Sequence, residues 1–267
     1  MKSDPLLSQL VGSPACAPKC RLEELLPKYQ ELGFTKFEGF SEWAEARLDW
    51  RGDPAVARTH FQKNRISVSS FHLPLIRAGA MEEGLQNALT AARYAGILGA
   101  RVVLLKAESK ELFGKIGRLF LDTLEGEGIK LETAVQNHKG TAISTIGDYQ
   151  EVFDSVGGDP RLKAVLEVGH FCRVGTGWKE GWDFLGERIC LIHVNDIADG
   201  KSVLYGSGRV DFSGLVRRIK ATAYAGDIVV ELELPGNESD TEATFDGLGR
   251  AIDLLLQLHS NVGTTET

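Results

Sequence analysis

Long apolar runs and cysteines are scarce in this chain of 267 residues. No apolar stretch approaches the roughly 20 residues that a membrane-spanning helix needs, so no membrane partner is expected. The four cysteines are too few and too scattered for a disulfide framework. The opening residues, Met1 to Pro5, lack the long apolar segment of a secretory signal. These absences favour a protein of the reducing cytoplasm.

A surplus of positive charge is also missing. Lysine and arginine number 30 against 37 aspartates and glutamates, which gives a net charge of −7. This balance disfavours a surface that follows a phosphate backbone, so no nucleic-acid partner is expected. Gly206 and Gly208 lack the strand-turn-helix context of a dinucleotide fingerprint and predict no nucleotide cofactor.

Short β-branched runs alternate with helical patterns along the whole chain. The spacing of the runs is about 30 residues, the length of a βαβ unit. Their centres lie near residues 9, 37, 68, 103, 132, 166, 191 and 230. Between them, apolar residues recur at helical spacing, as from Leu22 to Leu32 before Gly33 and from Phe245 to Leu255. The pattern predicts an α/β fold, a single (β/α)8 TIM barrel over residues 1–267, with a disordered tail at 261–267.

Polar side chains stand at the carboxyl ends of four of these runs. They are Gln136, Glu167, His193 and Glu231. Burying a polar side chain that can bind a metal ion at the end of a strand costs free energy unless the side chain has a partner. The carboxyl ends of parallel barrel strands meet at one rim, where the βα loops form the mouth of the barrel. We therefore expect these four side chains to converge on one site.

The residues around these strand ends resemble a known family pattern. The matching segments are Gln136-Asn137-His138, Glu167-x-x-His170, His193-x-x-Asp196, residues 226–231 and residues 206–212. Together they resemble the xylose-isomerase-like TIM-barrel superfamily, which includes sugar isomerases, ketose epimerases, inosose dehydratases and endonuclease IV. The resemblance covers most of the chain and is far more specific than any one of these segments alone.

The resemblance implies one divalent metal ion. Its ligands at the matching positions would be Gln136, Glu167, His193 and Glu231. Oxygen ligands with one imidazole suit Mn²⁺ or Mg²⁺ best, with Co²⁺ or Zn²⁺ as further options. The chain departs from the family pattern twice, because Gln136 replaces the usual glutamate and Glu167 the usual aspartate. A carboxamide can coordinate through its oxygen but cannot accept a proton at neutral pH.

The resemblance also implies an activity. We expect a metal-dependent sugar isomerase or epimerase that removes a proton next to a carbonyl of a carbohydrate or keto-sugar, with Glu231 as the base and a metal-stabilised enediolate. The same first step allows a lyase or dehydratase that acts on a keto-sugar, keto-glycoside or inosose. A non-catalytic sugar-binding barrel and an abasic-site endonuclease are weaker alternatives. The expected partner is a small carbohydrate. The sequence leaves open whether the chain forms a homo-oligomer.

Further candidate residues lie at or just beyond the strand ends. His72 and Lys106 are expected to hydrogen-bond substrate hydroxyls or to supply an acid. His170 is expected to contact the substrate or to take part in catalysis, rather than to bind the metal. His138 and Trp43 are further substrate-binding candidates.

Three assignments keep a structural alternative. Asp196 is expected either to orient His193 or to cap a turn. Glu38 resembles a family position near the barrel mouth. The aromatic residues after the second run, among them Trp43 and Trp50, form the wall of a sugar pocket or pack within their loop.

Overall fold

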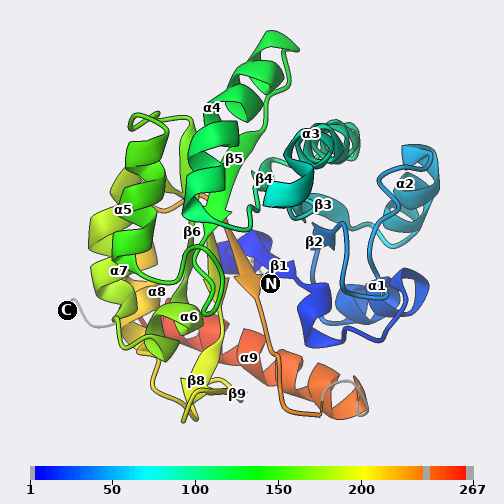
Figure 1. Cartoon of the computed structure of the whole chain (residues 1–267). Coiled ribbons are helices and arrows are strands. Elements are labelled where there is room, and N and C mark those ends of the chain that lie inside the picture. Colours follow the sequence, from blue (N-terminus) through cyan, green and yellow to red (C-terminus); the bar gives the residue numbers. More distant parts are fainter. Residues whose placement is uncertain (1–3, 237–240, 263–267) are drawn as a thin grey trace.

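The computed structural model describes residues 4–236 and 241–262, and these form a closed parallel β-barrel inside a layer of helices (Figure 1). The strands follow one another around the barrel in chain order, and β1 closes it by pairing with both β2 and β10. The barrel strands are β1 (Leu10–Gly12), β2 (Lys36–Phe40), β3 (Ser67–His72), β4 (Val102–Leu104), β5 (Glu132–Gln136), β6 (Leu162–Glu167), β7 (Ile189–Val194) and β10 (Asp227–Val230). The predicted single-domain (β/α)8 barrel is confirmed.

Helices surround the barrel, with α1 and α2 on one side and α5, α7 and α8 on the other (Figure 1). Their bounds are α1 (Leu22–Glu31), α2 (Pro54–Lys63), α3 (Met81–Ile97), α4 (Lys110–Gly126), α5 (Ile146–Ser155), α6 (Val168–Arg173), α7 (Trp178–Leu185), α8 (Phe212–Ala221) and α9 (Thr241–Asn261). Short 3-10 helices span Pro5–Gln9, Pro14–Cys16, Ala78–Ala80 and Gly186–Arg188. After α1 the chain turns at Gly33, whose φ of +89° suits glycine.

The apolar residues form two separate cores. Strand side chains alternate between the inside of the barrel and the helix-covered outside. The inner core consists of Val11, Val102, Leu104, Ala134, Val165, Cys190, Leu191 and Val229. The larger core lies between the strands and the helices. Because side chains fill the barrel interior, a ligand can bind only at the ends of the barrel.

Some elements differ from the sequence-based expectation. The chain beyond β7 forms a short antiparallel hairpin, β8 (Asp196–Ala198) with β9 (Lys201–Val203), which lies outside the barrel sheet. The tail was expected to start at residue 261, but Asn261 is the last residue of α9, and residues 263–267 lie outside the described part. All four cysteines are free thiols, as expected.

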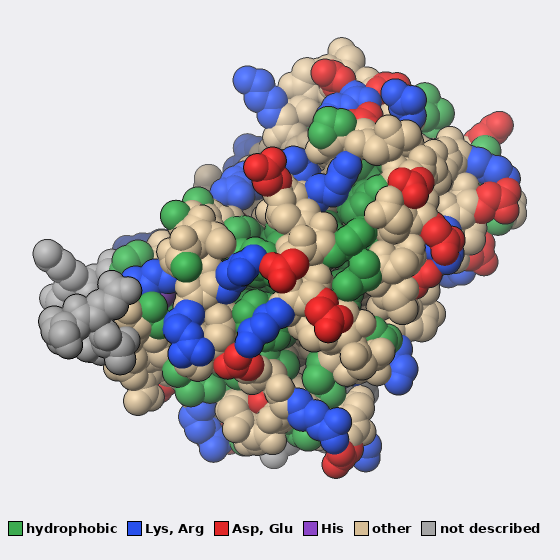
Figure 2. Space-filling model, turned by 90° about the vertical axis from the view of Figure 1, so that its left-hand side faces the viewer, with side chains coloured by type: hydrophobic (Ala, Val, Ile, Leu, Met, Phe, Trp, Pro, Cys, Tyr) green, Lys and Arg blue, Asp and Glu red, His purple; other side chains and the backbone are tan. Residues whose placement is uncertain are grey.

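The surface in Figure 2 carries basic and acidic side chains interspersed with one another. On α4 and α5, for example, Lys110 contacts Asp148 and Glu151 at 2.7 and 2.8 Å. Such mixing leaves no continuous basic stripe on the part of this face drawn in colour. None of the described helices is long and apolar enough to cross a membrane.

Candidate active site

Three of the expected ligands meet at the carboxyl end of the barrel. Glu167 on β6 pairs in register with His193 on β7, so both leave neighbouring strands at the same height. Nδ1 of His193 lies 3.0 Å from Glu167 Oε2 and 3.2 Å from Glu231 Oε1. All three side chains are buried, and their ligand atoms lie within 4.8 Å of one another, as a shared metal ion requires.

The fourth expected ligand, Gln136, lies against the same cluster. Its Nε2 donates a hydrogen bond of 2.8 Å to Glu167 Oε2 and lies 3.4 Å from His193 Nδ1. The amide nitrogen, rather than the oxygen, therefore faces the cluster. Rotation of the amide would be needed to offer its oxygen to a cation. In the orientation found, Gln136 supports the carboxylate of Glu167.

The electrostatics of the cluster fit a dication. Burial and then repulsion from Glu231 raise the pKa of Glu167 to about 7, against the opposing effects of His193 and Gln136. Burial alone would lower the pKa of His193, but the carboxylates of Glu38, Glu231 and Glu167 hold it well above the usual range. Glu167 Oε1 is buried without a hydrogen-bond partner among the described residues. Two carboxylates and one imidazole would balance a divalent ion and give that oxygen a partner.

Glu38 on β2 is a fully buried carboxylate behind this cluster. Its Oε1 lies 3.0 Å from Nε2 of both His72 and His193, although neither contact is aligned as a hydrogen bond. Hydroxyl groups of Ser13 and Ser70 donate to the same carboxylate at 3.0 and 3.2 Å. The side chains of Glu38, His72 and His193 form a second group whose ligand atoms lie close enough together to bind a metal ion. The sequence analysis singled out Glu38 because it resembles a family position near the barrel mouth.

Buried side chains below the site fix the ends of β5 and β6, and the sequence analysis missed their roles. The amide of Asn137 accepts a bond from Glu167 N at 3.2 Å and donates one to Glu167 O at 3.3 Å. The hydroxyl of Tyr149 accepts from Asn137 N at 2.8 Å and donates to Val165 O at 2.7 Å. Asn137, the middle residue of the Gln-Asn-His segment, thus holds the peptide of Glu167 in place.

His138 and His170 form a pair that is arranged around the Lys139 peptide. Their ring centroids are 3.8 Å apart. Lys139 N donates to His170 Nδ1 at 3.1 Å, which leaves the proton of a neutral His170 on Nε2. His138 Nδ1 lies 3.1 Å from the Lys139 carbonyl, which can only accept, so Nε2 of a neutral His138 is an acceptor. Burial lowers the pKa of His138, and lowers that of His170 to about 2, which favours the neutral form of each ring.

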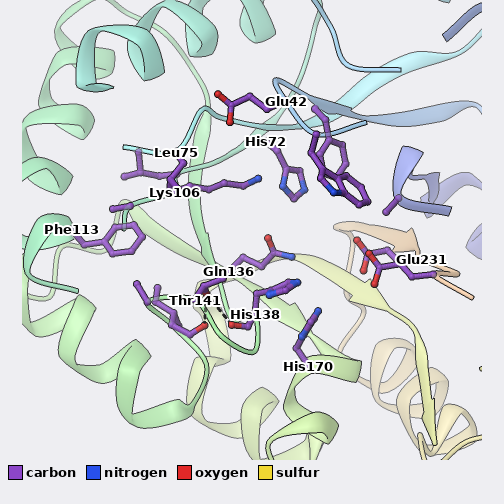
Figure 3. A pocket seen from close by; sticks show the side chains of 18 residues that line it. Glu42, His72, Leu75, Lys106, Phe113, Gln136, His138, Thr141, His170 and Glu231 are labelled. Atoms are coloured by element: carbon purple, nitrogen blue, oxygen red, sulfur yellow. Dashed lines mark hydrogen bonds between the residues drawn. The ribbon is translucent and has the colours of Figure 1, made fainter. Parts of the chain in front are cut away.

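A cavity of about 370 Å³ opens above the cluster. It brings together most of the expected site residues, namely Trp43, His72, Lys106, Gln136, His138, His170 and Glu231. Figure 3 shows Lys106 extending toward His72 from one side and Glu231 entering from the opposite side. Burial lowers the pKa of Lys106 to about 8, although Glu38, Glu42 and Glu231 act in the other direction.

His72 and Glu233 also belong to the polar part of the cavity. Burial and the neighbouring Lys106 lower the pKa of His72 to about 4, so this ring is neutral. Glu233, which the sequence analysis missed, also lines the cavity. Burial and then repulsion from Glu231 raise the pKa of Glu233 to about 8.

The structure separates the alternatives for Asp196 and the tryptophans. Asp196 accepts the backbone N–H groups of residues 197, 206, 208 and 210 at 2.8 to 3.1 Å, so it caps the following loop and does not orient His193. Trp43 lines the cavity and is 63% exposed. Trp50 is buried in the hydrophobic core, with the Arg51 guanidinium 3.8 Å from its ring centroid.

Comparison with known proteins agrees with the fold. The sequence matches the model of the xylose isomerase-like TIM barrel family over residues 26–255. The chain belongs to this family. Among curated proteins, none matches the sequence.

Several solved structures share the family fold along their whole length. A structure of the IOLI protein with a bound zinc atom has 16% sequence identity and a TM-score of 0.75, over 95% of this chain and 99% of that one. An L-ribulose 3-epimerase has 13% identity and a TM-score of 0.74, over 96% of both chains. The 3-keto-D-glucoside 4-epimerase of E. coli, in its apo form, has 13% identity and a TM-score of 0.74, over 92% of this chain and 99% of that one. At these identities the likeness shows the fold.

Proposed function

We propose that this member of the xylose isomerase-like family is a divalent-metal-dependent enzyme that moves a proton at the carbon next to the carbonyl of a keto-sugar. One observation carries the proposal. The buried carboxylates of Glu167 and Glu231 lie within 3.2 Å of Nδ1 on the imidazole of His193. This cluster lies beneath a cavity that Glu231 and Lys106 enter from opposite sides. This arrangement pairs a cation site with a base and an acid at one ligand cavity.

Glu167, His193 and Glu231 would hold the ion, with Gln136 bonded to Glu167 or turned to offer its amide oxygen. Mn²⁺ or Mg²⁺ suits the oxygen-rich donor set, and Zn²⁺ or Co²⁺ suits the imidazole. When bound, such an ion supplies positive charge that makes a C–H bond next to a carbonyl more acidic. The compartment in which the protein works stays a prediction.

Glu231 and Lys106 divide the proton transfers between them. The carboxylate of Glu231 takes the proton, and the electron pair of the C–H bond moves toward the carbonyl oxygen. Gln136 has no basic group and cannot return a proton from the other side. The ammonium of Lys106 faces the cavity opposite Glu231 and returns a proton to the other face of the carbon (Figure 3). The product is the epimer, and exchange with solvent restores Glu231 and Lys106.

The histidines bind the substrate in this proposal. His138 offers an acceptor and His170 a donor, so together they suit neighbouring hydroxyl groups of a sugar. Both nitrogens of His72 are shielded from solvent, and its ring stacks on Phe40 with centroids 4.1 Å apart. We therefore place His72 in the cavity wall, next to Glu38, rather than among the proton donors.

The glutamine at position 136 favours elimination as a second candidate function. Without a second carboxylate in the cluster, the same deprotonation by Glu231 can lead to loss of an oxygen substituent from the next carbon. The electron pair of the C–H bond then forms a C=C bond, the C–O bond breaks, and the Lys106 ammonium protonates the departing oxygen. That outcome is a lyase reaction.

The test is solvent-deuterium exchange, followed by NMR. Mn²⁺-supplemented protein is incubated in D₂O with a panel of keto-sugars and keto-glycosides, including 3-keto-D-glucosides. We expect deuterium next to the carbonyl of one substrate, together with its epimer, or an unsaturated product if elimination occurs. Glu231→Gln should lose the exchange, and Glu151→Gln on the exposed side of α5 should keep it. Sugar binding without exchange would contradict the enzyme and favour a sugar-binding barrel.

A further inference from the structure

We infer that the end of the cavity far from Glu231 is a subsite for an aryl group, so that the substrate is an aryl keto-glycoside rather than a free keto-sugar. This inference rests on the proposed function. It concerns the part of the cavity that the proton transfer does not use.

The cavity is polar at one end and apolar at the other. Figure 3 shows Leu75 and Phe113 at the end away from Glu231, with the Lys106 chain beside them. Ala107 and Ile143 also line the cavity, and Phe113 and Ile143 are nearly buried, with 3% and 2% of their surface exposed. These side chains come from the segments that follow β3, β4 and β5. Three loops and helix α4 therefore build one apolar surface within a single cavity.

A sugar alone leaves this apolar surface without a matching group. The sugar hydroxyls have partners nearer Glu231, where Gln136, His138 and His170 carry donors and acceptors (Figure 3). Hydroxyl groups placed against Leu75 and Phe113 would lose their bonds to water. The hydroxyl of Thr141, which lies next to Phe113, already bonds to the carbonyls of His138 and Ile143. An apolar substituent would instead be removed from water there, which is favourable in proportion to its area.

Flat aromatic groups suit the walls of this cavity. Phe113 presents a ring to the cavity, and aromatic pairs gain from offset or edge contacts beyond the burial of area. A second aromatic row begins at the rim, where the exposed ring of Trp43 lies 5.8 Å from that of Phe40. Trp43 has a φ of +75°, which is uncommon for a bulky residue. The sugar would lie between this row and the polar end, and its aglycone would reach Leu75 and Phe113.

The experiment compares phenyl and methyl 3-keto-β-D-glucosides by isothermal titration calorimetry on the Mn²⁺-loaded full chain. We expect the phenyl compound to bind at least about tenfold more tightly. Leu75→Asn should reduce that ratio toward one and leave the affinity for the methyl compound within about twofold. Leu119→Asn is the matched control, because Leu119 is an exposed leucine on α4 outside the cavity. Leu75→Ala gives a milder change if the asparagine variant does not fold.

The outcomes separate the two proposals. Equal affinities of the two glycosides would overturn the aryl subsite and leave the proposed function standing. A phenyl preference that survives in both Leu75 variants would also overturn the subsite. If neither glycoside binds and the exchange panel is negative, both proposals fail.

Discussion

Gln136 is the one expected metal ligand whose side chain carries neither a charge nor a basic group. It contacts Glu167 and His193, and it brings no charge to a cluster that already holds two carboxylates. We predict that Gln136→Glu tightens Mn²⁺ binding by roughly tenfold or more. Two carboxylates balance the charge of the ion, and a third gives the ion-bound cluster a net negative charge. Titration of the metal-free protein measures this affinity. Gln150→Glu on α5 is the control, and an unchanged affinity in Gln136→Glu would place the ion away from residue 136.

Lys106 should set the alkaline limit of activity. Its pKa is lowered to about 8 by burial, so the ammonium that donates the proton disappears as the pH rises through that value. We predict that turnover falls above pH 8 and that Lys106→Met lowers it by about 10²- to 10⁴-fold. Arginine stays protonated, so any activity that Lys106→Arg retains should persist to higher pH. The pH profile of epimer formation checks this, and an alkaline limit unchanged in Lys106→Arg would contradict the role of Lys106.

At the scale of single residues, the sequence identified the groups at strand ends but not the groups behind them. Glu167, His193 and Glu231 were found because polar residues stand out where apolar strands end. Glu38 and Asn137 were undervalued because their roles depend on long-range contacts, to His193 and to the Glu167 peptide. Glu233 belongs to no motif, and only the fold shows that it lines the cavity.

At the scale of elements, the start of α5 holds the loop that carries His138. Asp148 accepts hydrogen bonds from the backbone of Ser144 and Thr145 at 3.0 and 2.9 Å, and from Lys110 Nζ on α4 at 2.7 Å. Partial burial works against the charge, but these bonds outweigh it and lower the pKa of Asp148 to about 2. The carboxylate therefore stabilises the folded chain above the pKa of an unfolded aspartate. That contribution is lost as the pH falls through about 2.

We predict that Asp148→Asn lowers the free energy of unfolding by about 1 to 2 kcal/mol at pH 7. The difference from the natural protein should shrink between pH 4 and pH 2, because the natural carboxylate becomes protonated there. Urea unfolding at several pH values measures it. Asp154→Asn on the same helix is the control and should change the stability by less than about 0.5 kcal/mol. A loss that stays constant down to pH 2 would show that charge is not the cause.

Regular elements were easier to predict than short ones. The eight barrel strands are apolar runs at near-constant spacing, and α1, α3, α8 and α9 have a clear apolar face, so these elements were found from the sequence. Residues 168–185 form α6 and α7, and residues 196–203 form the β8–β9 hairpin, but none of these was predicted. Their segments are too short for a periodicity to stand out, and the hairpin is held by the loop that Asp196 caps.

At the scale of the whole molecule, the barrel explains why residues 136, 167, 193 and 231 act together. They are spread over about a third of the chain, but parallel strands in a closed barrel end at one rim. The filled interior below leaves this rim and its cavity as the place for a ligand. The account thus depends on one claim, that the cluster around His193 binds a divalent ion.

Anomalous diffraction from crystals grown with Mn²⁺ tests that claim most directly. We predict one strong peak about 2.0 to 2.6 Å from a carboxylate oxygen of Glu167, one of Glu231 and Nδ1 of His193. The same experiment on His193→Ala should show no peak there. A natural protein without this peak, or with its ion between Glu38, His72 and Nε2 of His193 instead, would contradict the account.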